Sequence, residues 1–110
     1  MPLLTAETST LLVVDLQERL MPAIAGAAGV LGNAARLVRA ATRLEVPVTT
    51  TEQDPTKLGP TVSPVADLLP TPAVTKSTFA ASLDLPGTRV VVCGCEAHVC
   101  VLQTLSLIHI

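Results

Sequence analysis

Aromatic side chains are almost missing from this 110-residue sequence, in which Phe79 is accompanied by no tryptophan and no tyrosine. Its core has to be filled by Val, Leu, Ile and Ala, the usual filling of a sheet that helices cover on both faces. Charge is also scarce, at 15% of residues against 49% hydrophobic residues, which excludes a disordered or highly charged binding segment. The composition therefore favours one compact, aliphatic domain.

Basic charge, long apolar runs and a disulfide framework are lacking as well. The net charge is −2 without a basic stripe, so we expect no nucleic-acid partner. The N-terminus has neither the basic start nor the apolar run of a signal peptide, and no window approaches the roughly 18 apolar residues of a membrane span. Three cysteines without framework spacing favour reduced thiols. We expect a cytoplasmic protein without membrane association.

Short apolar or β-branched runs alternate with helical patterns along the chain. The run TLLVVDL at residues 10–16 is typical of a parallel strand buried on both faces, and Asp15 sits where that strand would end. Further strands are expected at residues 47–51, 73–76 and 88–93. Strands that alternate with helices imply right-handed crossovers, so the predicted fold class is α/β with a parallel sheet.

The main crossover helix is expected to follow Asn33, a suitable N-cap residue. Its predicted apolar face consists of Ala34, Leu37, Val38, Ala41 and Leu44, with the arginines at 36, 39 and 43 largely on the other face. Residues 52–72 carry five prolines around a short helix near 62–69, a pattern typical of an active-site loop or of disorder. A helical turn is expected within residues 77–83, and a further helix from Ala97 onward.

The stretch RVVVCGCEAHVCVLQ at residues 89–103 organises the rest of the chain. An apolar strand reaches Gly94, a short polar turn follows, and Cys100 opens the next predicted helix. Unpaired N–H groups and the positive dipole end at a helix start favour thiolate over thiol. Asp15, Lys76 and Cys100 then fall at the carboxyl ends of strands or just beyond them, the edge at which open parallel sheets bind ligands.

A thiol nucleophile needs a base, a cation that holds the thiolate, and donors aimed at the oxyanion. Asp15 is the candidate base, Lys76 the candidate cation, and the N–H groups of the turn before Cys100 the candidate donors. Plain alternatives are a capping acid and a solvated surface lysine. Cysteines in apolar strands are usually inert small hydrophobes, and this is our interpretation of Cys93 and Cys95.

Four segments resemble, in this order, the isochorismatase-like cysteine hydrolase superfamily, and most closely its isochorismatase domain-containing protein 2 type. They are LLVVDLQERLMPAI around Asp15, VTTTEQDPTKLGPTV ending at Val62, VTKSTFAAS around Lys76, and VVVCGCEAHVCVLQT around Cys100. The resemblance implies a Rossmann-like sheet of strand order 3-2-1-4-5-6, with helices on both faces and strands 1–4 present here. It also implies a catalytic triad of Asp15, Lys76 and Cys100.

The resemblance further implies a non-proline cis peptide between Cys95 and Glu96, with the amides of Glu96 and Cys100 forming the oxyanion hole. Amide-hydrolysing members use the cysteine to form a thioacyl intermediate, so we expect hydrolysis of a small amide or related C–N bond. The nicotinamidase branch carries an Asp-x-His metal motif after the second strand, where residues 51–53 here read Thr, Glu and Gln. We therefore expect no metal and no cofactor.

The partner expected from this interpretation is a small-molecule substrate, held in a pocket lined by Gln17, Glu52, Gln53, Phe79 and His98. His98 is not expected to pair with Cys100, because helix positions two apart point to different faces. A second hypothesis is a thiol metal or redox site built from Cys93, Cys95, His98 and Cys100, although this spacing is not a standard zinc signature. A third is a catalytically inactive interaction or oligomerisation module of the same fold.

The C-terminal residues depart from the family pattern, which continues with a full helix and further strands. This chain instead ends TLSLIHI, and its last five to seven residues are interpreted as foreign to the family sequence. Residues 1–110 are accordingly expected to form a single, C-terminally incomplete hydrolase domain. We expect homo-oligomers of the full-length protein, and weak or absent catalysis by the fragment. An exposed apolar strand edge would invite self-association.

Overall fold

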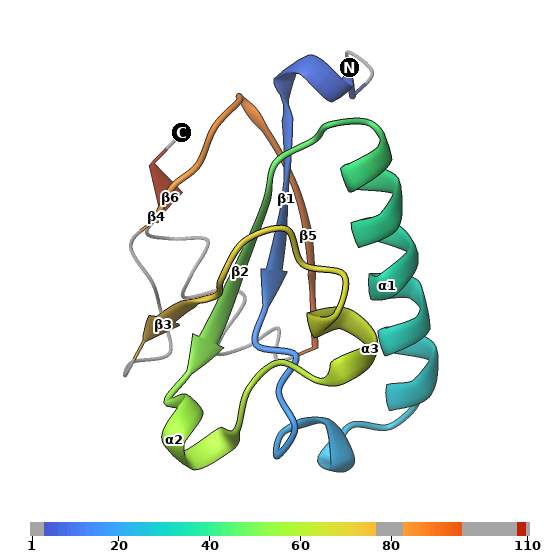
Figure 1. Ribbon diagram of the computed structural model, residues 1–110, viewed down its shortest axis with the longest axis vertical. Coiled ribbons are helices and arrows are strands. Elements are labelled where there is room, and N and C mark those ends of the chain that lie inside the picture. Colours follow the sequence, from blue (N-terminus) through green and yellow to red (C-terminus); the bar gives the residue numbers. More distant parts are fainter. Residues whose placement is uncertain (1–3, 77–82, 96–107, 110) are drawn as a thin grey trace.

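The computed structural model describes residues 4–76, 83–95 and 108–109, and its centre is a four-stranded parallel sheet (Figure 1). The strands follow the spatial order β3-β2-β1-β5, so the predicted order 3-2-1-4 is confirmed. Their bounds are β1 Ser9–Val14, β2 Val48–Gln53, β3 Val74–Lys76 and β5 Arg89–Gly94. All four coincide with the apolar or β-branched runs of the sequence.

Strand β1 occupies one of the two inner positions because its whole run is apolar or hydroxyl-bearing, and each of its residues is buried. Leu11 pairs with Val48 of β2 on one side and with Val91 of β5 on the other. Strand β5 is one edge of this sheet, and its residues are only half-buried or exposed. Arg89 is its exposed residue and its valines are half-buried, so the expected exposure of apolar surface at the fourth strand stays a prediction.

Helix α1, Ala27–Arg43, covers one face of the sheet (Figure 1). It begins earlier than predicted. Its N-cap residue is Gly26, with a φ of 70°, so the prediction of Asn33 as the N-cap was wrong. Asn33 lies within the helix on its exposed side, where its Oδ1 accepts a hydrogen bond of 3.0 Å from Nη1 of Arg36. A left-handed glycine starts this helix in place of a side-chain cap.

The inner face of α1 is displaced from the predicted apolar stripe. Ala34, Ala35, Val38 and Ala41 are buried, whereas Leu37 is 39% exposed and Leu44 is 62% exposed. At 100° per residue, the two leucines lie at the margin of the helix face that the buried residues occupy. The prediction was therefore wrong for Leu37 and Leu44.

Buried side chains form a cluster on each face of the sheet. The larger one joins Leu11, Val13 and Leu16 to Val38 of α1 and to Val65. On the opposite face, Leu12 and Val14 pack with Leu85 and with two valines of β5. Burying an aliphatic side chain of this size contributes about 1.5–3 kcal/mol, so both clusters hold β1 in place.

The remaining elements are short. They are the 3-10 helices Ala6–Thr8 and Met21–Ala23, helix α2 Pro55–Leu58, helix α3 Ser63–Ala66, and the two-residue strands β4 Leu83–Asp84 and β6 Ile108–His109. Helix α3 confirms the short helix expected within the proline-rich segment, and it packs on α1. No helix among these described residues is long and apolar enough to cross a bilayer.

Two sequence predictions meet parts of the chain that are only partly described. The helical turn expected within residues 77–83 falls mostly outside the described residues, and Leu83 itself is in strand β4. The helix expected from Ala97 falls on residues 97–107, which lie outside the described residues. The described residues that follow, Ile108–His109, form strand β6, which pairs in parallel with β4. The prediction of helices on both faces rests on these same segments.

Candidate functional site

Four positions singled out in the sequence meet at the carboxyl edge of the sheet. Asp15 follows β1, Gln53 and Lys76 end β2 and β3, and Cys95 follows β5. The register brings them level, because Val14 pairs with Thr51 on one side and with Gly94 on the other. Open parallel sheets bind ligands at this edge.

Asp15 is locked in place directly after β1. Its side chain is 1% exposed, and its Oδ1 accepts a hydrogen bond of 2.8 Å from Oγ1 of Thr51. Its backbone N–H donates to the carbonyl of Thr51 at 3.2 Å, and its φ is 51°, in the left-handed region. Non-glycine residues held there cost about 1–3 kcal/mol each and cluster at functional sites.

Gln17 ties the chain after β1 to the end of β2 by a reciprocal amide pair. The backbone N–H of Gln53 donates to Oε1 of Gln17, and Nε2 of Gln17 donates to the carbonyl of Gln53, both at 2.8 Å. Nε2 also donates to the carbonyl of Gly59 at 2.8 Å. Gln17 is fully buried, so these contacts describe a structural brace, and its predicted role in lining a pocket stays a prediction.

The side chain of Gln53 is 6% exposed. Its Nε2 lies 3.5 Å from Oδ2 of Asp54, while its buried Oε1 accepts no hydrogen bond from any described residue. Leaving a buried acceptor unsatisfied costs about 1–3 kcal/mol. Asp54, immediately after β2, has a φ of 35°, so strands β1 and β2 both end in a left-handed aspartate.

Glu52 points to the other face of β2, because side chains alternate along a strand. Its Oε2 accepts hydrogen bonds from the backbone N–H of Thr61 at 2.7 Å and from Oγ1 of Thr61 at 2.8 Å. These bonds fasten the proline-rich segment to β2. Glu52, Pro60 and Thr61 line one side of a cavity of about 390 Å³ that Ala66 and residues 69–73 complete. The role of Glu52 in lining a substrate pocket stays a prediction.

Lys76 ends β3 in register with Gln53, so its backbone reaches the same edge as Asp15. Strand β2 lies between them, and two strand spacings amount to roughly 10 Å. The other predicted site residues, Phe79, Glu96, His98 and Cys100, lie outside the described residues, as does the expected cis peptide between Cys95 and Glu96. The triad and the oxyanion hole stay predictions.

The two described cysteines face the α1 side of β5. Burial raises the pKa of the Cys93 thiol from 9.0 to about 11, so it stays protonated at neutral pH. Cys95 packs with its Sγ 3.7 Å from Sδ of Met21. These environments suit the interpretation of both as inert small hydrophobes. Within residues 4–76, 83–95 and 108–109, no three His, Cys, Asp or Glu side chains gather to hold a metal ion.

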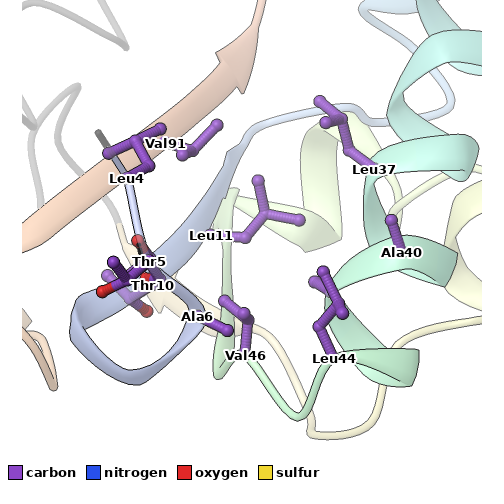
Figure 2. A pocket seen from close by; sticks show the side chains of 12 residues that line it. Leu4, Thr5, Ala6, Thr10, Leu11, Leu37, Ala40, Leu44, Val46 and Val91 are labelled. Atoms are coloured by element: carbon purple, nitrogen blue, oxygen red, sulfur yellow. Dashed lines mark hydrogen bonds between the residues drawn. The ribbon is translucent and has the colours of Figure 1, made fainter.

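Sequence reasoning missed an apolar hollow at the other end of the sheet (Figure 2). It has a volume of about 230 Å³ and lies between the start of β1 and the end of α1. Leu4, Leu37 and Leu44 line it together with Leu11 and Val91. Leu37 and Leu44, which lie to one side of the buried face of α1, were the signal in the sequence that could have indicated this hollow. Its polar side chains are the hydroxyls of Thr5, Ser9 and Thr10, and none of its described lining residues carries a charge.

A parallel sheet of order 3-2-1-4 with helices, whose polar residues collect at the carboxyl edge, defines an open α/β fold with a candidate site at that edge. The profile of the Isochorismatase domain matches residues 9–108, and the chain belongs to this family. Isochorismatase domain-containing protein 2A of Mus musculus is 38% identical over 112 residues, covering 94% of this chain and 54% of that protein. The isochorismatase domain-containing protein 2 of Danio rerio is 37% identical over 110 residues, covering 92% and 55%.

Two solved structures share this fold. A Caenorhabditis elegans protein described as MAR1 ribonuclease superposes with a TM-score of 0.83 at 33% identity, covering 94% of this chain and 58% of that one. A hypothetical protein from Trypanosoma cruzi gives a TM-score of 0.78 at 32% identity, covering 91% and 57%. The chain spans about half the length of the curated relatives it matches.

Proposed function

We propose that this chain carries the active site of a cysteine hydrolase that cleaves small amides or related C–N bonds through a thioacyl intermediate. The observation that supports it most is the buried Asp15 carboxylate, held by Thr51 at the carboxyl edge of the sheet. Lys76 ends a strand at that edge, and Cys100 follows within the segment that matches the family. Cys100 is the nucleophile, Asp15 the base and Lys76 the cation of this proposal.

The reaction proceeds in two halves. The Asp15 carboxylate takes the proton of the Cys100 thiol, and the thiolate attacks the carbonyl carbon of the amide. The tetrahedral adduct collapses, the C–N bond breaks, and the amine leaves with the proton that Asp15 held. Water, deprotonated by Asp15, then attacks the thioester, and the carboxylic acid leaves as the thiol re-forms. The charge of Lys76 stabilises the thiolate, and backbone N–H groups stabilise the oxyanion.

Competitive labelling tests the nucleophile. Iodoacetamide at pH 7.5, followed by peptide mass spectrometry, should modify Cys100 at least 10-fold faster than Cys93, whose pKa is about 11. Asp15→Asn should slow the labelling of Cys100 while leaving Cys93 unchanged. Equal labelling of the cysteines in the folded protein would argue against a nucleophilic Cys100.

Turnover is tested in the full-length protein against a panel of small primary amides. Cys100→Ala should abolish release of the amine, and Asp15→Asn and Lys76→Met should each lower kcat/KM by about 10²–10⁴. Lys57→Met is the matched control, because Lys57 lies in α2 and is exposed. Amine release that persists in Cys100→Ala would exclude the thioacyl route.

A second candidate is hydrolysis of RNA, favoured by the likeness to the Caenorhabditis elegans protein described as a ribonuclease. The net charge of −2 disfavours it, because phosphate contacts need Lys and Arg. Incubation with a labelled single-stranded RNA, with Asp15→Asn as the control, separates the two candidates. The proposal also includes a cytoplasmic location, no cofactor, and a homo-oligomer of the full-length protein, which light scattering after size exclusion would measure.

A further inference from the structure

We propose that Gln53 is a specificity-determining residue that recognises the amide nitrogen of the substrate, so that the site favours amides with an N–H over esters. In this inference, which rests on the proposed hydrolase function, Oε1 of Gln53 accepts a hydrogen bond from the substrate N–H. Gln17 is the positioning residue that holds Gln53 in place. The site would then select substrates by their leaving group, an amine rather than an alcohol.

The starting point is the carbonyl oxygen of the Gln53 side chain. It is buried and receives no hydrogen bond from the part of the chain that the structure describes, while Nε2 of the same amide faces Oδ2 of Asp54 at 3.5 Å. Exchanging the oxygen and nitrogen would place a carbonyl oxygen against a carboxylate, so the assignment stands on electrostatic grounds. Buried acceptors of this kind need an explanation, and a donor brought by a ligand is one.

The position of Gln53 is fixed by more than the sheet. Both of its backbone polar groups are taken by the side-chain amide of Gln17, which is itself fully buried. The second hydrogen of that amide is bonded to Gly59. The backbone of Gln53 therefore cannot turn to satisfy its own side chain without breaking two buried hydrogen bonds.

The orphan oxygen lies on the side of the sheet that carries the Asp15 carboxylate. Side chains two apart on a strand share a face, so Gln53 and Thr51 point the same way, with about 6.5 Å between their Cα atoms. Thr51 is the residue that holds Asp15. A small amide whose carbonyl carbon lies near the base can thus present its N–H to Gln53. An ester offers only an oxygen there, which an acceptor repels.

Matched substrates test this in the full-length protein. The probes are the primary amides and the methyl esters of acetic, propionic and benzoic acid, and the variants are Gln53→Met, which removes the acceptor at similar length, and Gln53→Glu, which keeps an acceptor. Gln53→Met should lower kcat/KM for the amides by about 10–100-fold and for the esters by less than 3-fold. Gln53→Glu should keep the preference for amides. Equal losses on amides and esters would overturn the inference and leave the hydrolase proposal standing.

Binding to Cys100→Ser gives a readout without turnover and without a Gln53 variant. Benzamide should bind this variant at least 10-fold more tightly than N,N-dimethylbenzamide, which has no N–H to donate, when both are titrated by NMR. Equal affinity would overturn the inference even if Gln53→Met fails to fold. Absence of amide and ester turnover in the wild type, with the binding preference intact, would instead overturn the hydrolase proposal alone.

Discussion

Oγ1 of Thr51 donates a hydrogen bond of 2.8 Å to Oδ1 of Asp15, and both side chains are almost completely buried. The bond joins residues 36 positions apart, one at the end of β1 and one within the neighbouring strand. A second bond between the same two residues runs from the N–H of Asp15 to the carbonyl of Thr51 at 3.2 Å. The candidate base is therefore oriented by its neighbour strand through both side chain and backbone.

Thr51→Val should destabilise the protein by about 1.5–3 kcal/mol, because it removes a hydrogen bond to a buried carboxylate while nearly conserving volume. Urea unfolding at pH 7 measures the change. Thr49→Val is the matched control on the same face of β2, where the side chain is only half-buried, and it should change stability by less than about 0.5 kcal/mol. Similar losses in both variants would show that the Asp15 bond contributes nothing specific.

Gly87→Ala should cost about 2–4 kcal/mol. The φ of Gly87 is +82°, and a Cβ there would lie 2.5 Å from the carbonyl oxygen of Thr8, a backbone atom that cannot move aside cheaply. Gly32→Ala in α1 meets no atom within 4 Å and should stabilise by about 0.5–1 kcal/mol through helix propensity. Thermal unfolding of the two variants should therefore shift in opposite directions.

Asn33→Ala distinguishes the observed start of α1 from the one expected from the sequence. Because Asn33 is exposed within the helix, alanine should stabilise by up to about 0.7 kcal/mol, less a few tenths for the lost bond to Arg36. A capping residue would instead lose about 0.5–2 kcal/mol. Arg36→Ala, which removes the same side-chain bond from the other end, is the control, and urea unfolding gives the sign.

The thiol of Cys93 should make the protein less stable at alkaline pH. Its pKa is raised by burial to about 11, against 9.0 in the unfolded chain, so above pH 9 the unfolded state loses this proton first. The contribution of Cys93 is complete below pH 9 and declines between pH 9 and 11. Cys93→Ala should therefore unfold with a shallower loss of stability over that interval, measured by urea unfolding at each pH. Parallel profiles for variant and wild type would contradict the raised pKa.

The sheet could be predicted from the sequence because each strand is a short apolar or β-branched run, which the buried run of β1 shows most clearly. The start of α1 could not, because two glycines in residues 27–32 lower helix propensity, and packing overrides it. Ala27, Val30 and Leu31 all pack against the core cluster. Tertiary contacts of this kind leave no local signal.

The candidate site, like the fold, has parts that could be predicted from the sequence and parts that could not. Asp15 could be identified because an acid at the end of an apolar run is visible in the sequence, and Gln53 followed from its place after the second strand. The hydrogen bonds that position them, from Thr51 and from Gln17, link residues 36 apart and could not be predicted. The positive φ of Asp15 could not be predicted either, because most aspartates have a negative φ and only the assembled fold holds this one in the left-handed region.

The amide of Gln17 pairs with Gln53 much as a residue of one more strand would, and its spare hydrogen reaches Gly59. The backbone also bonds the segment after β1 to the turn after α2, from the N–H of Glu18 to the carbonyl of Pro60 and from the N–H of Arg19 to the carbonyl of Leu58. Opening of any one of the three segments therefore has to break hydrogen bonds to another, and we expect them to open together. The amide hydrogen exchange rate of Gln53 would report how often this edge of the sheet opens.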